Sequence, residues 1–125
     1  PEKLLLSEDV EMVVVPGAEG DFGVLIGHAS LISALRPGVI DTYAGTKVEK
    51  RIFVAGGFAE VTGERCTVLA EEAMPVEDID QSEAEARVAA AREALEQADN
   101  DLARGQAEMA LAVGEAMVAA HGTGV

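Results

Sequence analysis

The chain has 125 residues and a formal net charge of −14, from 23 acidic and 9 basic side chains. This charge excludes a protein that binds nucleic acid through a basic face, and it excludes electrostatic attachment to anionic lipid. The single cysteine, Cys66, excludes an internal disulfide, and no apolar run approaches the roughly 18 residues that a membrane span needs.

The first part of the chain alternates short apolar runs with turn signals. Pro16-Gly17, Arg36-Pro37-Gly38 and Gly56-Gly57 each follow or precede such a run. Short strands separated by turns of this kind are typical of an antiparallel sandwich or barrel. The strands predicted on this basis cover residues 10–15, 22–26, 39–43, 51–55, 58–62 and 65–70.

The second part of the chain is rich in alanine and predicts two helices. Ser82 and Glu85 have the spacing of a capping box, which marks the start of a helix. Gly105 is predicted to break the helix and let the chain reverse, so that residues 106–120 form the second helix. An apolar seam with alternating spacings of four and three residues is expected to pack the two helices together: Ala84, Val88, Ala91, Leu95, Ala98 and Leu102. Leu111, Met109 and Met117 are expected to join this packing.

The boundary between the two parts is predicted at Met74-Pro75, since nine of the 13 glycines precede it. The predicted fold class is α+β, with an N-terminal antiparallel β-sandwich (residues 1–74) followed by a C-terminal antiparallel two-helix hairpin (residues 75–125). Residues 71–125 also hold 13 of the 23 acidic residues and only three of the nine basic ones.

Patterns that would indicate catalysis, a metal or a cofactor are not found. The glycine-rich run at residues 17–23 lacks the Lys-Ser/Thr pair of a phosphate-binding loop, and the two histidines, His28 and His121, have no nucleophile and orienting group in sequence context. The acidic residues between 78 and 85 do not follow the EF-hand ligand pattern, and they suit the N-terminus of a helix. Cys66 is expected to be a small core residue. These features describe a non-catalytic interaction or coupling module.

Four segments resemble the epsilon subunits of F-type, proton-translocating ATP synthases, and they occur in that family's order. They cover residues 13–29, 35–40, 53–61 and 68–71. The resemblance implies the same sandwich-plus-hairpin fold and a non-catalytic central-stalk subunit, with no cofactor, that couples the gamma shaft to the c-ring. It also implies a peripheral position at the cytoplasmic face of the bacterial inner membrane. The family's opening strand normally precedes the pair that resembles Pro1-Glu2, so the sandwich either lacks that strand or the strand lies outside this sequence.

The resemblance also implies which residues face the rotor partners. The turn of Glu19, Gly20, Asp21, Phe22 and Gly23, together with His28, is associated in the family with the c-ring and the foot of the gamma shaft. The acidic Glu19 and Asp21 would suit basic groups on the ring. Two prolines that commonly flank the family's Gly-His-Ala run are absent around His28, which predicts a less rigid turn here.

The hairpin departs from the family in two respects. In bacterial relatives it often brakes ATP hydrolysis by contacting the alpha/beta catalytic head, commonly through basic groups on the second helix. No Lys or Arg follows Arg104 here, and Glu108 and Glu115 lie in that region, so we expect weak or absent inhibition.

A nucleotide-binding motif of some relatives is degenerate in this chain. Ile79, Asp80 and Ala84 match it, but Glu83 replaces the arginine that would contact phosphate. We therefore expect little or no ATP affinity. An ATP-sensing regulatory module of the same complex, a generic protein-interaction adaptor and a small enzyme are the alternatives.

Overall fold

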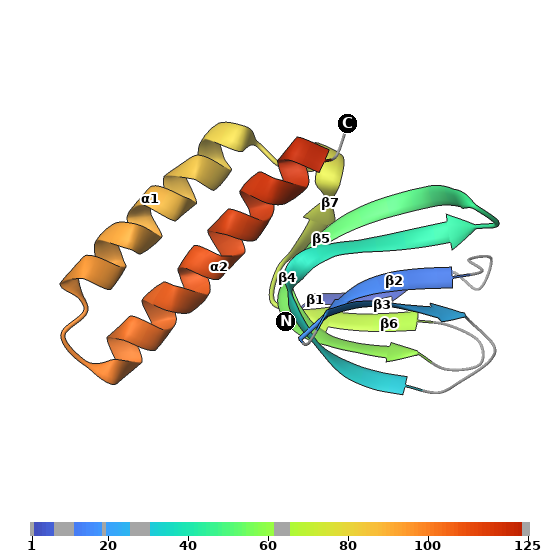
Figure 1. Cartoon of the computed structure of the whole chain (residues 1–125), viewed down its shortest axis with the longest axis horizontal. Helices are drawn as coiled ribbons and strands as arrows, with labels where there is room; N and C mark the ends of the chain where they lie inside the picture. The colour runs from blue at the N-terminus through green and yellow to red at the C-terminus, as the bar shows by residue number, and fades with distance from the viewer. Residues whose placement is uncertain (1, 7–11, 19, 26–30, 62–65, 124–125) are drawn as a thin grey trace. The chain divides into compact units, whose positions relative to one another are not determined.

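The computed structural model describes residues 2–6, 12–18, 20–25, 31–61 and 66–123 (Figure 1). The chain divides into two compact units, Pro1–Val76 and Glu77–Val125, two residues beyond the boundary expected from composition. The order of elements confirms the predicted fold class, with an antiparallel β-sheet domain followed by two helices.

Within the residues that the structure describes, the first unit is a seven-stranded antiparallel sheet. The strands are β1 (Glu2–Leu6), β2 (Met12–Gly17), β3 (Gly20–Leu25), β4 (Leu31–Ala44), β5 (Lys47–Val61), β6 (Cys66–Ala70) and β7 (Ala73–Pro75). Six of them follow one another across the sheet in the order β1-β6-β5-β4-β2-β3, and β7 pairs with β5. A short 3-10 turn, η1, follows at Val76–Asp78. The strand β1 has no turn signal or alternation to mark it in the sequence.

The two longest strands, β4 and β5, curve so strongly that each takes part in both layers of the sandwich (Figure 1). Along β5, residues 52–54 pair with β7, whereas residues 58–61 pair with β6. The bend in β5 falls at Gly56 and Gly57, whose φ angles of 98° and 124° favour glycine. The predicted turns at Arg36-Pro37-Gly38 and Gly56-Gly57 are therefore wrong, since both lie inside continuous strands.

The core of the sandwich consists of aliphatic side chains from the inner faces of both layers. Val13, Ile40, Val54 and Val68 are each fully buried. The strands that carry them are rich in β-branched residues, which pack well on a pleated surface. The complete cluster is Val13, Val15, Leu35, Ile40, Ile52, Val54, Ala59, Val68 and Ala70.

The second unit is an antiparallel helical hairpin made of α1 (Gln81–Gln97) and α2 (Asp101–Thr123). The N-cap of α1 is Asp80, whose Oδ1 accepts a hydrogen bond from the backbone N–H of Glu83 at 3.2 Å. The predicted capping box is therefore wrong, because Ser82 already lies within the helix. Both residue types can cap a helix, and Asp80 comes first along the chain.

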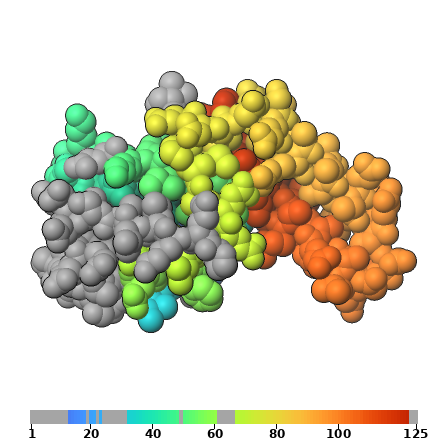
Figure 2. Space-filling model, turned by 180° about the vertical axis from the view of Figure 1, so that it is seen from behind, coloured from blue at the N-terminus to red at the C-terminus, as the bar shows by residue number. Residues whose placement is uncertain are grey.

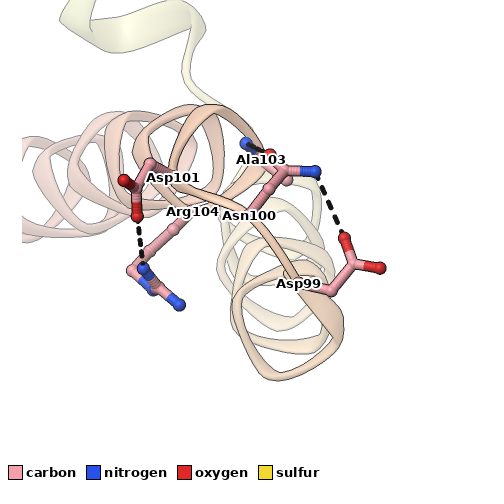
Figure 3. A network of polar contacts seen from close by, with 5 residues as sticks. All are labelled: Asp99, Asn100, Asp101, Ala103 and Arg104. Carbon is pink, nitrogen blue, oxygen red and sulfur yellow. Dashed lines mark hydrogen bonds and ion pairs between the residues drawn. The ribbon is translucent and has the colours of Figure 1, made fainter.

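The reversal between the helices occupies residues 98–100 (Figure 3). Asn100 caps α2: its Oδ1 accepts from the backbone N–H of Ala103 at 2.8 Å, and its carbonyl accepts from the N–H of Arg104 at 3.0 Å. Asp101, in the first turn, pairs with Arg104 at 3.1 Å. The predicted break at Gly105 is wrong, because the capped helix begins four residues earlier and continues through this glycine.

The helices pack through small residues. Ala84 and Ala91 of α1 and Ala107 and Ala120 of α2 are buried, as is Met117. Figure 2 shows the hairpin from behind, with α1 in yellow to orange lying along the darker α2.

The helices lie close together at Gly114, where an added Cβ would lie 3.0 Å from Cγ2 of Val88. Two residues expected in the packing are instead exposed: Leu102 and Met109 retain 73% and 60% of their accessible surface. Leu102 follows the reversal, which ends the seam of α1.

Candidate docking surfaces

The outer face of the sheet formed by β4, β5 and β6 carries a group of exposed apolar side chains. Phe58 stands opposite Leu69 on β6 and opposite Ala34 on β4, so the three side chains project from the same face. Ile32 lies two residues before Ala34 and shares that face. We call Ile32, Ala34, Phe58 and Leu69 the outer-sheet patch.

The patch is exposed where a solvated sheet face would ordinarily carry polar residues. Ile32, Phe58 and Leu69 keep 71%, 57% and 47% of their accessible surface. Their neighbours on the same strands behave differently: Leu35, Ala59 and Val68 point inward and are buried.

Polar residues border the patch. Glu60, directly opposite Ile32 on the next strand, is exposed, and Thr67 on β6 stands opposite Glu60. An apolar centre with a polar border is the composition of a protein interface.

The turn between β2 and β3 is held by one side chain from β4. Arg36 donates from Nη1 to the carbonyl of Gly17 at 2.7 Å, and its Nη2 pairs with Oδ1 of Asp21. The backbone N–H of Ala18 also donates to the carbonyl of Ala34 at 3.1 Å. The Arg36 and Asp21 side chains remain 44% and 62% exposed, so the pair lies at the surface.

The residues predicted for the rotor interface are only partly described. Gly20 and Gly23 are exposed on β3, and Gly20 has a φ of 145°, which suits glycine beside the turn. Asp21 is exposed, but its carboxylate already pairs with Arg36 of the same chain. Glu19 and His28 lie outside the described residues, as does the side chain of Phe22.

The degenerate nucleotide motif is used by the helix itself. Asp80 is the N-cap of α1, and Ile79 and Ala84 are buried, with 5% and 0% of their surface exposed. Glu83 is exposed and donates its backbone N–H to Asp80. Of the four motif positions, Ile79 and Ala84 are therefore buried in packing, and Asp80 serves as the helix cap.

Several other predicted features can be located. His121 lies in the last turn of α2, as expected. Cys66 begins β6, but its side chain lies outside the described residues, so its expected burial is untested. Within the described ranges, no three His, Cys, Asp or Glu side chains come together in a way that could hold a metal ion. None of the helices there combines the length and apolar character needed to cross a membrane.

The outer-sheet patch was not predicted from the sequence. The alternation of Phe58 and Glu60 with Ala59 was visible and correctly separates two faces of the strand. It does not indicate which face is buried, because Phe58 and Ala59 are both apolar.

Comparison with known proteins gives consistent results. Residues 1–76 match the family described as the ATP synthase delta/epsilon chain, beta-sandwich domain. The ATP synthase epsilon chain of Rhodospirillum rubrum is 54% identical over 121 residues, covering 97% of this chain and 90% of the relative. That of Paramagnetospirillum magneticum is 58% identical over 120 residues, covering 96% and 90%.

Two solved structures are similar over most of the chain. A chain in the cryo-EM structure of the Euglena gracilis mitochondrial ATP synthase, described as OSCP/F1/c-ring, superposes with a TM-score of 0.73 at 32% identity. It covers 89% of this chain and 69% of that one. A chain of the Tetrahymena thermophila mitochondrial ATP synthase central stalk and c-ring has a TM-score of 0.64 at 13% identity. The match covers 90% of this chain and 83% of that one, and at this identity it supports the fold alone.

Proposed function

Because the chain belongs to the family of ATP synthase epsilon chains, we propose that it joins the gamma shaft to the c-ring of a proton-translocating ATP synthase. Its role is that of a non-catalytic rotor-stalk subunit. It transmits rotation through contacts and carries out no chemical step. The observation that carries the proposal is the outer-sheet patch, a set of apolar side chains exposed on a rigid sheet.

The outer-sheet patch is the proposed contact with the gamma subunit. Phe58 lies at its centre, flanked by Ala34 and Leu69 on the neighbouring strands. Binding hot spots lie near the centre of an interface, where neighbouring side chains exclude water, and Phe58 has the large apolar surface that such a position requires. The continuous ladder of β4, β5 and β6 holds these side chains in fixed register, so little order has to be imposed on binding.

The turn between β2 and β3 is the proposed contact with the c-ring and the foot of the shaft. The residues proposed for it are Glu19, Gly20, Asp21, Phe22, Gly23 and His28. Support comes from the family resemblance and from the exposure of Gly20, Asp21 and Gly23. Since Asp21 is paired with Arg36, the acidic group left to meet a basic partner in this proposal is Glu19.

The hairpin is proposed to inhibit ATP hydrolysis weakly or not at all. The residues after Arg104 contain no basic side chain except His121, and Glu108 and Glu115 are both exposed. Acidic segments of a catalytic head would be repelled by this helix. Truncation after Val76, which keeps β7 intact, should leave hydrolysis by the assembled enzyme nearly unchanged; strong activation would contradict this part of the proposal.

The complex is proposed to place this chain at the cytoplasmic face of a bacterial inner membrane. Support comes from the high identity to epsilon chains of Rhodospirillum rubrum and Paramagnetospirillum magneticum.

The proposal is tested by size-exclusion chromatography of the full chain mixed with its cognate gamma subunit. The wild-type chain should co-elute, and Phe58→Ser should weaken the complex by about tenfold or more, as expected for a central apolar contact. Leu102→Ser is the matched control, because Leu102 is exposed to a similar degree on the hairpin. Equal binding by wild type and Phe58→Ser would reject the patch as the contact. No co-elution of folded wild type would favour the adaptor alternative.

A further inference from the structure

Arg36 connects three strands near the point where the pairing of β2 with β4 is interrupted. It belongs to β4, and its guanidinium binds Gly17, the last residue of β2, and Asp21, the second residue of β3. One side chain therefore contacts both ends of the turn between β2 and β3. The planar guanidinium suits this role, because its donors diverge in a fixed geometry.

Backbone pairing between β2 and β3 continues up to the turn, where Gly17 pairs with Gly20, but the pairing of β2 with β4 is interrupted just before it. The register between β2 and β4 shifts between Val14, which pairs with Asp41, and Gly17, which pairs with Leu35. Three residue steps along β2 thus correspond to six along β4, and the regular ladder is lost between these pairs. Pro16 and Pro37 both lie in this interval, and neither has an N–H to donate.

Packing fixes the base of this region, and the side chain of Arg36 adds to the backbone contacts at the turn itself. Pro16 is buried against Gly38, where an added Cβ would lie 2.8 Å from the proline Cβ. Among the described residues beyond Pro16, β4 reaches the turn through the pairing of Leu35 with Gly17, the N–H of Ala18 bonded to Ala34 and the two bonds of Arg36. The bond to Gly17 is partly buried, which protects it from competition by water.

We propose that Arg36 is a positioning residue that clamps the β2–β3 turn in the conformation presented to its rotor partner. This inference rests on the proposed function of the turn. In this arrangement Asp21 acts as an anchor within the chain, and its charge is compensated before any partner binds. The partner then meets a turn whose two ends, at Gly17 and Asp21, are held by Arg36.

The clamp predicts a specific order among variants. Arg36→Met removes both bonds and leaves the Asp21 carboxylate uncompensated. Arg36→Lys keeps the charge but not the forked geometry, so it should restore function only in part. The double variant Arg36→Met/Asp21→Asn removes both charges. If the clamp matters, the double variant should bind the rotor partner as weakly as Arg36→Met does. If only the uncompensated charge matters, the double variant should bind as tightly as wild type.

The control is Arg51→Met, which removes another Arg–Asp pair from the same sheet. Arg51 bonds Asp41 at 3.0 Å, further along β4 and away from the turn. This variant should leave the turn unchanged.

The experiment combines two measurements on the full-length chain. Amide hydrogen exchange of residues 17–21 in the free chain reports the clamp, with the core amides of Val13 and Val68 as internal reference. Affinity for the cognate gamma–c-ring complex reports positioning. We expect Arg36→Met to speed exchange in the turn by about five- to tenfold relative to the core, and to weaken binding by a similar factor.

Two results would overturn the inference. Turn exchange in Arg36→Met equal to wild type would show that no clamp exists. Faster exchange with unchanged affinity would show that the clamp does not position the turn for binding. The charge reversal Glu19→Lys separates this from failure of the proposed function: if that variant weakens binding, the turn is an interface and only the role of Arg36 is lost. If Glu19→Lys binds normally, the proposed contact of the turn fails as well.

Discussion

Two glycines within α2 provide a test of how closely the hairpin helices are packed. Gly105 and Gly114 are both interior helical residues, so replacing either with alanine gains the same intrinsic helix propensity, about 1 kcal/mol. At Gly105 an added Cβ would have no heavy atom within 4 Å. Gly105→Ala should therefore stabilise the hairpin by about 0.5–1 kcal/mol.

At Gly114 the same methyl group would meet Val88 on α1. It would lie 3.0 Å from Cγ2, 3.2 Å from the backbone nitrogen and 3.4 Å from Cα. A rotation of the valine side chain can relieve only the first contact, so the helices must also separate slightly. Overpacking of this kind costs about 1–3 kcal/mol, which cancels or exceeds the gain in propensity. Gly114→Ala should therefore be less stable than Gly105→Ala by about 1–3 kcal/mol.

The assay is urea unfolding of the full chain followed by helical circular dichroism at about 222 nm, where the helix signal dominates. In the background Val88→Ala, which removes Cγ2, the penalty of Gly114→Ala should decrease but not vanish, since the backbone contacts remain. Equal midpoint shifts for Gly105→Ala and Gly114→Ala would refute the close approach of the two helices. So would an unchanged penalty in the Val88→Ala background.

Three further predictions follow from single contacts. Gly57→Ala should destabilise the sandwich by about 3 kcal/mol or more in thermal unfolding, because the new Cβ would lie 2.0 Å from the carbonyl oxygen of Leu69, at a φ of 124°. The control Gly45→Ala, at a φ of 65° and in open space, should cost only about 1–2 kcal/mol. Equal losses of stability in the two variants would contradict this prediction. Asn100→Ala should destabilise the hairpin by about 1 kcal/mol in urea unfolding, because the hydrogen bond that caps α2 at Ala103 is lost. Asn100→Asp should retain most of the stability. An Asn100→Ala variant as stable as wild type would exclude the cap. Isothermal calorimetry with ATP should detect no saturable binding at micromolar concentrations. The reason is that Glu83 occupies the position of the phosphate-binding arginine and that Asp80 caps α1. Saturable binding would instead support the ATP-sensing alternative.

The sequence was sufficient for the parts of the fold that depend on local periodicity. The β-branched run before Pro16 forms β2, and the alternation from Phe58 to Glu60 forms part of β5. The alanine-rich segment forms two helices because alanine has the highest helix propensity and allows close packing. These features are set by short stretches of chain, so they can be recognised without knowledge of the neighbours.

The errors arose where one residue type serves two structures. Gly56-Gly57 and Arg36-Pro37-Gly38 are ordinary turn signals, but here they bend the long strands β5 and β4. Only pairing with neighbouring strands keeps those segments extended, and pairing is not visible in the sequence. Gly105 likewise resembles a helix end, yet Asn100 begins the helix earlier and carries it past the glycine.

The candidate site was only partly predictable for a related reason. Asp21 was recognised as an exposed acidic residue of the turn, but its partner Arg36 is 15 residues away and reaches it only because β4 runs beside β2. The outer-sheet patch depends on which face of the sheet is buried. That choice is made by the second layer of the sandwich, which a single strand pattern cannot reveal.

The most direct test of the central claim is hydroxyl-radical footprinting of the full chain with and without its cognate gamma subunit. Ile32, Phe58 and Leu69 are exposed and should react in the free chain, as should Leu102 and Met109 on the hairpin. The account predicts that binding protects Ile32, Phe58 and Leu69 while Leu102 and Met109 stay reactive. Protection of the two hairpin residues with an unprotected outer-sheet patch would contradict it.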